Sequence, residues 1–222
     1  MALFSMRATI IGRSKARSAV AAAAYRAGVE LTDERRGERY SYKRKRGVAH
    51  VEILAPEGAP SWVFDRSALW NAAERSERYC NAQVAREVRI ALPSELSHEA
   101  QLELVRSFVR DEFVARGMVA DVALHREKDH NPHVHVMLTM RELGPNGFGA
   151  KGTRWNSWAL NRHWRQAWEH YANQALAMEG RPERIDHRSY AERGIELTPE
   201  PKLWTSRHEP SSYQRQVTRA RL

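Results

Sequence analysis

The sequence of 222 residues has one cysteine, Cys80, and no long apolar run. One cysteine cannot form an internal disulfide, so a disulfide-stapled secreted domain is excluded and a reducing compartment is expected. No stretch approaches the roughly 18 apolar residues that a membrane span requires, and the first residues lack the apolar core of a secretory signal. These absences predict a cytoplasmic protein without a membrane span.

Acidic residues are outnumbered. The chain has 27 Asp and Glu against 36 Lys and Arg, a formal net charge of +9, and the pI is about 10.0. A pI above about 9 is typical of a protein that binds a phosphate backbone. The alternative is a charge that serves solubility alone. Apolar residues make up 42%, which is enough to build a core.

Apolar periodicity and turn residues predict alternating strands and helices. Strands are expected at residues 5–12, 48–56, 84–93, 118–127 and 132–142. Helices are expected at residues 15–28, 65–81, 97–117 and 156–180, with a basic loop or hairpin at 33–47 and a glycine-rich loop at 144–152. Short loops and a hairpin favour an α+β fold with a central antiparallel sheet of about five strands and helices packed mainly on one face.

The segment "DHNPHVHVML" (129–138) places His133 and His135 two residues apart in an apolar run. Side chains alternate across a strand, so both rings face the same way. His125 precedes them on the expected partner strand. Three neutral imidazoles on one face suit a divalent cation and leave positions open for substrate, whereas the structural alternative is a polar, solvent-facing sheet surface.

A second unusual segment is "SAVAAAAYRAG" (18–28), in which four alanines precede Tyr25. One interpretation is a small-residue helix face packed on the sheet, with Tyr25 in the core and its hydroxyl at the rim. The other is a nucleophilic tyrosine beside a metal-bound phosphate. Tyr40 and Tyr42, which alternate in the basic segment, are competing candidates for catalysis or for stacking on bases.

These segments resemble a known family. "GRSKARSAVAAAAYRAG", "REVRIALPSEL", "HREKDHNPHVHVML" and "DHRSYAERGIELTPEP" together are similar to the MobA/MobL relaxases of mobilisable and conjugative plasmids, which are tyrosine members of the HUH endonuclease superfamily. The similarity runs over residues 1–200, the expected relaxase domain. The late motif departs from the family pattern, since "PEPKLWTSRHEP" lacks the histidine and glycine that often follow the proline. Residues 201–222 are expected to be a basic polar tail or a linker to a further C-terminal region.

The resemblance implies an HUH relaxase-like fold and a DNA nicking-closing activity at the origin of transfer. Tyr25 would attack the scissile phosphate, remain joined to the 5′ end, and release the strand when it is reclosed after transfer. His125, His133 and His135 would hold one divalent metal ion, which is Mn, Mg or Zn. Glu87 matches the family's acidic position and would orient a metal-bound histidine or help to deprotonate Tyr25. The implied partners are single-stranded origin DNA, accessory relaxosome proteins and a type IV coupling protein, in the bacterial cytoplasm.

DNA binding is expected to depend on phosphate contacts and on stacking. The predicted DNA-binding residues are Arg26, Arg35, Arg36, Lys43, Arg44, Lys45, Arg46, Lys151, Arg154 and Trp155. Trp158 and Trp164 are further stacking candidates, although tryptophans at helical spacing usually line a core, and that interpretation is favoured for Trp164 and Trp168.

The residues themselves leave two other functions open. A metal-dependent nuclease that uses water would need the same histidines but not Tyr25. A non-catalytic, basic single-stranded DNA-binding module would need only the charge. The oligomeric state is not predicted.

Overall fold

The computed structural model describes residues 4–126, 131–189 and 191–196. The chain divides into two units, Met1–His187 and Arg188–Leu222. In the second unit, the backbone N–H and the hydroxyl of Ser189 donate to the Glu192 carboxylate at 2.8 and 3.0 Å. Residue 200, where the sequence predicts the first domain to end, and the tail 201–222 lie outside the described residues.

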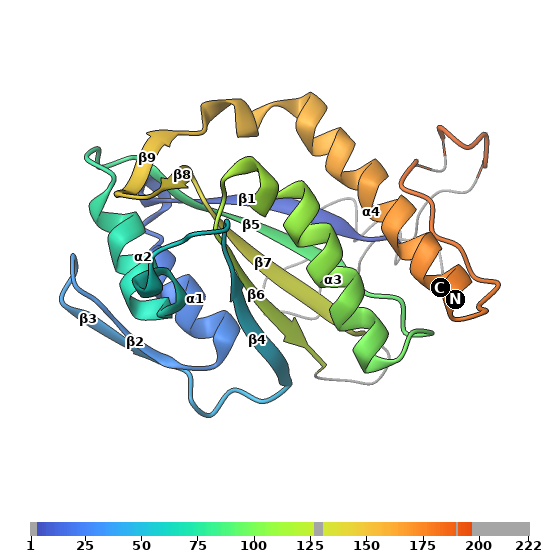
Figure 1. The fold of residues 1–222 in the computed structure, drawn as a ribbon, viewed down its shortest axis with the longest axis horizontal. Coiled ribbons are helices and arrows are strands. Elements are labelled where there is room, and N and C mark those ends of the chain that lie inside the picture. The colour runs from blue at the N-terminus through green and yellow to red at the C-terminus, as the bar shows by residue number, and fades with distance from the viewer. Residues whose placement is uncertain (1–3, 127–130, 190, 197–222) are drawn as a thin grey trace, which may run out of the picture. The chain divides into compact units, whose positions relative to one another are not determined.

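A five-stranded sheet in the order β1-β5-β7-β6-β4 forms the centre of the first unit (Figure 1). All neighbouring strands are antiparallel, which confirms the predicted fold class. The strands are β1 (Met6–Gly12), β4 (Val48–Leu54), β5 (Gln83–Ala91), β6 (Ala120–His125) and β7 (His133–Thr139). Because side chains alternate, the sheet presents one apolar face and one face that carries the histidines.

The two longest helices cover the apolar face. They are α3 (His98–Glu112), which lies across the sheet in Figure 1, and α4 (Trp158–Met178). Ser97 caps α3 by accepting a hydrogen bond from the Ala100 N–H at 3.1 Å. Phe108, Trp164 and Trp168 are fully buried in this layer with the apolar side chains of β5, β6 and β7.

Two shorter helices, α1 (Ala19–Ala27) and α2 (Arg66–Arg75), pack on the other face of the sheet. Their core includes Ala23 and Ala24 of α1, Trp70 of α2 and Met137 of β7. Asp121 fixes α2 to this face by accepting hydrogen bonds from the Arg66 guanidinium and from Trp70 Nε1, the latter at 2.8 Å. The histidine-bearing face is therefore shared between the sheet and these helices.

Two hairpins complete the unit. One hairpin consists of β2 (Glu30–Asp33) and β3 (Glu38–Ser41), so it begins before the basic segment 33–47 and ends within it. A second hairpin, β8 (Arg141–Gly144) and β9 (Gly147–Lys151), replaces the predicted glycine-rich loop, because Gly147 adopts φ 104° at the turn. Short 3-10 helices lie at Arg13–Lys15, Ser61–Phe64, Val114–Arg116 and Thr153–Asn156.

Helix α2 ends at Arg75, earlier than the predicted residue 81. The carbonyl oxygens of Glu77 and Tyr79 accept hydrogen bonds from Arg13 Nη1 at 3.0 and 3.1 Å. Arg13 directly follows β1, so these carbonyls bond to a distant side chain and not to the backbone N–H groups of a longer α2. Within the described part of the chain, no helix combines the length and apolar character that crossing a bilayer requires.

Candidate active site

Three histidines converge on the face shared with α1. His125 ends β6, while His133 and His135 lie on β7, and His125 is paired directly with His133 across the two strands. The ring centroid of His125 is 5.3 Å from that of His133 and 4.7 Å from that of His135. The centroids of His133 and His135 are 5.1 Å apart. One ligand atom from each ring lies within 4.8 Å of the other two, a spacing that suits a single metal ion.

Each of these rings has one nitrogen fixed by an oxygen acceptor. His125 Nε2 donates to the Arg26 carbonyl at 2.7 Å, and His133 Nδ1 donates to the Asn131 carbonyl at 3.0 Å. His135 Nδ1 donates to Glu87 Oε1 at 2.7 Å. A ring nitrogen that donates sets the tautomer and leaves the lone pair of the other nitrogen available, which is the arrangement found around bound metals. The donor set therefore fits one divalent cation.

Burial keeps two of the rings neutral. It lowers the pKa of His125 from 6.5 to about 4, against the opposing effect of the Arg26 hydrogen bond. Burial also lowers the pKa of His135, although the Glu87 carboxylate partly offsets it. Neutral imidazole is the form that binds metal, so the site does not have to release protons from these two rings near neutral pH.

Glu87 of β5 is held on all sides. Arg26 forms a bidentate ion pair with it, Nε to Oε1 and Nη2 to Oε2, both at 2.5 Å, and Thr9 Oγ1 lies 3.5 Å from Oε2. Burial alone would raise the pKa of Glu87, but the hydrogen bonds from His135 and Arg26 hold it well below its usual range. A carboxylate with both oxygens occupied and a depressed pKa is a poor proton acceptor, and this favours the expectation that Glu87 orients His135 over the expectation that it deprotonates Tyr25.

Helix α1 carries the candidate nucleophile. Ser18 caps its start by accepting from the Ala21 N–H at 3.2 Å, and Gly28 ends it at φ 66°. The buried positions follow one face, and the residues are Ala19, Val20, Ala23, Ala24 and Ala27. Tyr25 lies outside that face and is 47% exposed. The interpretation of Tyr25 as a core residue is therefore wrong.

The Tyr25 ring is held from two sides. The ring of Tyr42 meets it edge-on at 5.2 Å, and Lys45 Nζ lies 3.8 Å above the ring centroid. Lys45 Nζ also donates to the Tyr25 carbonyl at 3.0 Å. Of the competing tyrosines, Tyr40 donates its hydroxyl to Glu38, and that hydrogen bond raises the pKa of the Tyr40 phenol. Tyr40 is thus a poorer nucleophile, and Tyr42 is part of the packing around Tyr25.

Comparison with known proteins identifies the family of this chain. Residues 17–209 match the MobA/MobL family. The chain belongs to the MobA/MobL family. It is 37% identical over 230 residues to the conjugal transfer protein TraA of Rhizobium radiobacter, covering 90% of this chain and 21% of that protein. It is 36% identical over 233 residues to the mobilization protein MobL of Acidithiobacillus ferridurans, covering 90% of this chain and 61% of MobL. The chain thus spans about a fifth of the length of TraA.

Solved structures share the fold. A structure described as the molecular basis of vancomycin resistance transfer in Staphylococcus aureus is 31% identical, with a TM-score of 0.78, covering 85% of this chain and all of that one. The conjugative relaxase TrwC, solved in a metal-bound complex with oriT DNA, is 11% identical with a TM-score of 0.55, covering 97% of this chain and 90% of TrwC. The TrwC likeness shows the fold alone.

The basic residues predicted to bind DNA differ in their surroundings in this MobA/MobL chain. Arg26 is 14% exposed and bound to Glu87, so it does not offer its guanidinium to a phosphate. Arg35 pairs with buried Glu74 at 3.3 Å, and Arg36 is 3.8 Å from Asp33. Lys43 Nζ lies 3.5 Å from the Glu30 carboxylate, and Lys45 Nζ lies over the Tyr25 ring. Arg44 and Arg46 are exposed.

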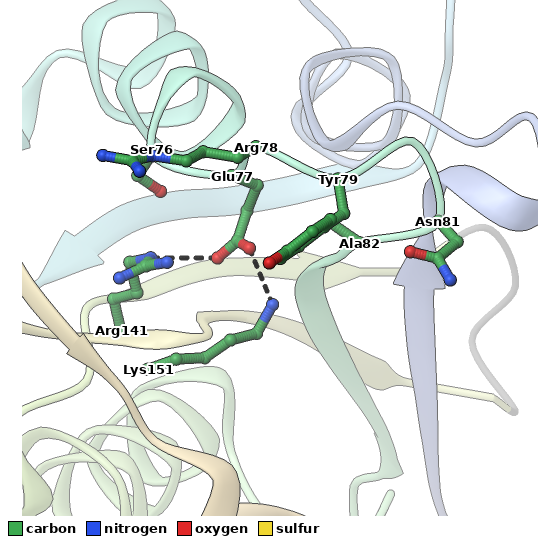
Figure 2. A pocket seen from close by; sticks show the side chains of 8 residues that line it. All are labelled: Ser76, Glu77, Arg78, Tyr79, Asn81, Ala82, Arg141 and Lys151. Atoms are coloured by element: carbon green, nitrogen blue, oxygen red, sulfur yellow. Dashed lines mark hydrogen bonds and ion pairs between the residues drawn. The ribbon is translucent and has the colours of Figure 1, made fainter.

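Two predicted contacts on the β8–β9 side lie away from the triad. Lys151 lines a cavity of about 470 Å³ in which it and Arg141 both bind the carboxylate of Glu77, at 2.8 and 2.9 Å (Figure 2). Lys151 also donates to the carbonyl of Gln83, the first residue of β5, whereas His133 pairs with the last residue of β5. Arg154 is exposed and pairs with Glu142.

The structure places Trp155 in the core. It is 2% exposed, and its ring occupies the space above Gly152. It is therefore not available to stack on a base, and the prediction is corrected on that point. Trp158 is 74% exposed, with the Arg162 guanidinium 5.4 Å from its ring. Trp164 and Trp168 are buried, as favoured from their spacing.

Sequence reasoning missed the supports of the site. Glu74 of α2 is completely buried and accepts the Ala19 N–H at 2.9 Å, which anchors the first turn of α1. Arg13 binds the same carboxylate at 3.1 Å. These contacts join residues that are far apart in sequence, and no local spacing predicts them.

Proposed function

We propose that this chain is a DNA relaxase domain that nicks one strand at a plasmid origin of transfer by transesterification on Tyr25, and rejoins that strand after transfer. The observation that supports it is the exposed tyrosine on the helix whose last turn is bonded to the histidine triad, through the Arg26 carbonyl and His125 Nε2. The relatives named for conjugal transfer and mobilization support the same assignment.

The proposed reaction conserves the phosphodiester bond. The Tyr25 hydroxyl oxygen attacks the scissile phosphorus and forms a new phosphorus–oxygen bond as the phenol loses its proton. The bond to the 3′ oxygen breaks, and that oxygen leaves as a 3′-hydroxyl. The 5′ phosphate stays on the tyrosine, so attack by a 3′-hydroxyl restores the strand without an energy source.

His125, His133 and His135 would hold one divalent cation, which supplies charge neutralisation at the non-bridging phosphate oxygens when bound. Glu87 keeps His135 in the tautomer that leaves Nε2 for the metal. Lys45 and Tyr42 fix the plane of the Tyr25 ring, so the phenol is presented in one orientation. In the cell the proposal requires single-stranded origin DNA, accessory relaxosome proteins and a type IV coupling protein in the bacterial cytoplasm.

A covalent-adduct assay tests the proposal. The protein is incubated with end-labelled single-stranded origin DNA and Mn²⁺, and denaturing electrophoresis and peptide mass spectrometry identify the linked residue. We expect an adduct on Tyr25 that Tyr25→Phe abolishes and that Tyr79→Phe, at a 76% exposed tyrosine, leaves intact.

The other outcomes identify the alternatives. Free 5′-phosphate product that persists in Tyr25→Phe would indicate a metal-dependent nuclease that uses water. DNA binding without cleavage, unaffected by chelator and by His133→Ala, would indicate a non-catalytic binding module. An adduct that still forms in Tyr25→Phe would show that the nucleophile is misassigned.

A further inference from the structure

Arg26 has a place in this site that its basic charge does not suggest. It follows Tyr25 directly and lies in the last turn of α1. Its guanidinium donates from all three nitrogens to protein acceptors: Nε and Nη2 to Glu87, and Nη1 to the Ala22 carbonyl at 2.9 Å. The side chain is 14% exposed. A guanidinium so occupied is part of the protein's framework and not a free phosphate ligand.

The same residue reaches two of the three histidines by independent routes. Through its side chain it holds Glu87, which accepts from His135 Nδ1 at 2.7 Å. Through its backbone carbonyl it accepts from His125 Nε2 at 2.7 Å. Both contacts select the ring tautomer and rotation that leave the opposite nitrogen available to a metal.

We propose that Arg26 is a positioning residue that fixes the helix bearing Tyr25 to the metal centre in a single register. The inference rests on the proposed function and deepens it, because it assigns to one side chain the alignment of nucleophile and metal. A planar, bidentate guanidinium–carboxylate pair constrains both distance and angle, which a lysine ammonium does not. Losing the pair therefore releases Glu87, loosens His135, and frees the last turn of α1 from β5.

The chain contains a matched control. Arg66 binds Asp121 with the same two-nitrogen geometry, Nε and Nη2 each at 2.8 Å, and its side chain is similarly buried, with 15% exposed. That pair also joins a helix to the same sheet face, but it does not touch the histidines in any contact that the described residues show. Arg66→Gln therefore measures how much stability is lost with a buried bidentate ion pair that does not orient the histidines.

The experiment measures Mn²⁺ dissociation constants by isothermal titration, with Tm as a measure of folding, for native protein, Arg26→Gln, Arg26→Lys and Arg66→Gln. We expect Arg26→Gln to weaken Mn²⁺ binding about tenfold or more, the size typical of outer ligand-orienting groups. Arg26→Lys should weaken Mn²⁺ binding nearly as much, because lysine keeps the positive charge but cannot form the bidentate pair with Glu87. Arg66→Gln should lower Tm to a similar extent with unchanged Mn²⁺ affinity.

A double-mutant cycle tests whether Arg26 acts through Glu87. Glu87→Gln alone should weaken Mn²⁺ binding, and adding Arg26→Gln should then have little further effect. Equal Mn²⁺ affinity in Arg26→Gln and native protein, or equal losses in the Arg26 and Arg66 variants, would overturn the inference. If Arg26→Gln does not fold, Arg26→Lys decides by the same criterion.

The experiments distinguish failure of the proposed relaxase function from failure of the proposed role of Arg26. Native protein that binds Mn²⁺ but forms no DNA adduct would overturn the relaxase assignment and leave the Arg26 result standing. Native protein that binds no Mn²⁺ at the triad would overturn both.

Discussion

His125 Nε2 lies 2.7 Å from the carbonyl oxygen of Arg26, so a histidine on the central sheet is hydrogen-bonded to the residue next to Tyr25. This one contact joins β6 to the last turn of α1. It uses a helix-terminal carbonyl that has no partner within its own helix, a group that must be satisfied in some way. The helix that carries the candidate nucleophile is therefore connected to the candidate metal ligands by backbone as well as by side chains.

Removing one ring of the triad should remove metal binding. We expect His133→Ala to weaken Mn²⁺ binding by about a hundredfold or more, because one of three protein ligands is lost and the remaining two cannot hold the ion alone. Isothermal titration measures the effect. His170→Ala, at an exposed position of α4, should leave the affinity unchanged. Equal affinity in both variants would show that the ion binds elsewhere.

Metal binding should depend weakly on pH below neutrality. Protons compete for the lone pair, so three imidazoles with an ordinary pKa near 6.5 would lose affinity by roughly 50-fold between pH 7.5 and 6.0. Burial already lowers the pKa of His125 to about 4, so this ring stays neutral in that range, and burial lowers the pKa of His135, so protons compete less for it than for a free imidazole. We expect a smaller loss, measured by titrating Mn²⁺ at both pH values. A loss of 50-fold or more would contradict the buried geometry.

The lowered pKa of His125 should also make the stability of the metal-free protein depend on pH. The pKa of His125 falls from 6.5 to about 4 on folding, so the unfolded chain takes up the proton more readily between these values. The free energy of unfolding should therefore decrease as pH falls from about 6.5 towards 4, because the unfolded state binds more protons there. Urea denaturation at several pH values measures this, and His125→Gln should flatten the dependence.

The histidine site could be predicted because it follows from strand periodicity. His133 and His135 must share a face, and the hairpin brings His125 beside them. The sheet order could not be predicted in the same way, because β1 and β4 reach the sheet edges through long connections. The expectation for Arg26 failed for a related reason. An arginine in a basic chain looks like a phosphate ligand until the fold places Glu87, which lies 61 residues away, against its guanidinium.

Trp155 shows how local context can mislead. It follows Arg154 and a glycine-rich stretch, a setting that suggests an exposed stacking ring. Residues 147–151 instead form a strand, and Gly152 provides the space into which the indole folds. A glycine in such a stretch predicts a loop, whereas Gly152 lets a large ring approach the backbone.

Gly152 should therefore tolerate no side chain. A Cβ at this position would lie 2.4 Å from two ring carbons of Trp155, and the ring is buried, so it cannot swing aside freely. We expect Gly152→Ala to lower the free energy of unfolding by about 2–3 kcal/mol, the upper part of the range for overpacking. Gly149→Ala is the control, because its Cβ would meet only the Glu142 carbonyl at an ordinary 3.7 Å. Urea denaturation of both variants measures the difference, and equal stabilities would contradict the observed packing of Trp155.

DNA affinity should fall with salt in proportion to the number of phosphates contacted. Arg44 and Arg46 are exposed on the segment that leads from β3 to β4, beside Lys45 and Tyr25, and we expect them to contact phosphates near the nucleophile. For single-stranded DNA each phosphate contact contributes about −0.7 to the slope of log K against log salt. The double variant Arg44→Ala/Arg46→Ala should therefore make the slope less negative by about 1.4. Fluorescence anisotropy with a labelled single strand, at several NaCl concentrations, measures it.

The control for this effect is Arg110→Ala, at an exposed position of α3, which packs on the opposite face of the sheet. It removes one unit of the same charge, so a purely long-range effect of net charge would weaken binding in both proteins in proportion to the charge removed. A slope that changes only in the Arg44 and Arg46 variant would assign the contacts to the histidine-bearing side. If Arg110→Ala changes the slope by about 0.7 as well, the DNA path extends over the α3 face, and phosphate binding is not confined to the Tyr25 side.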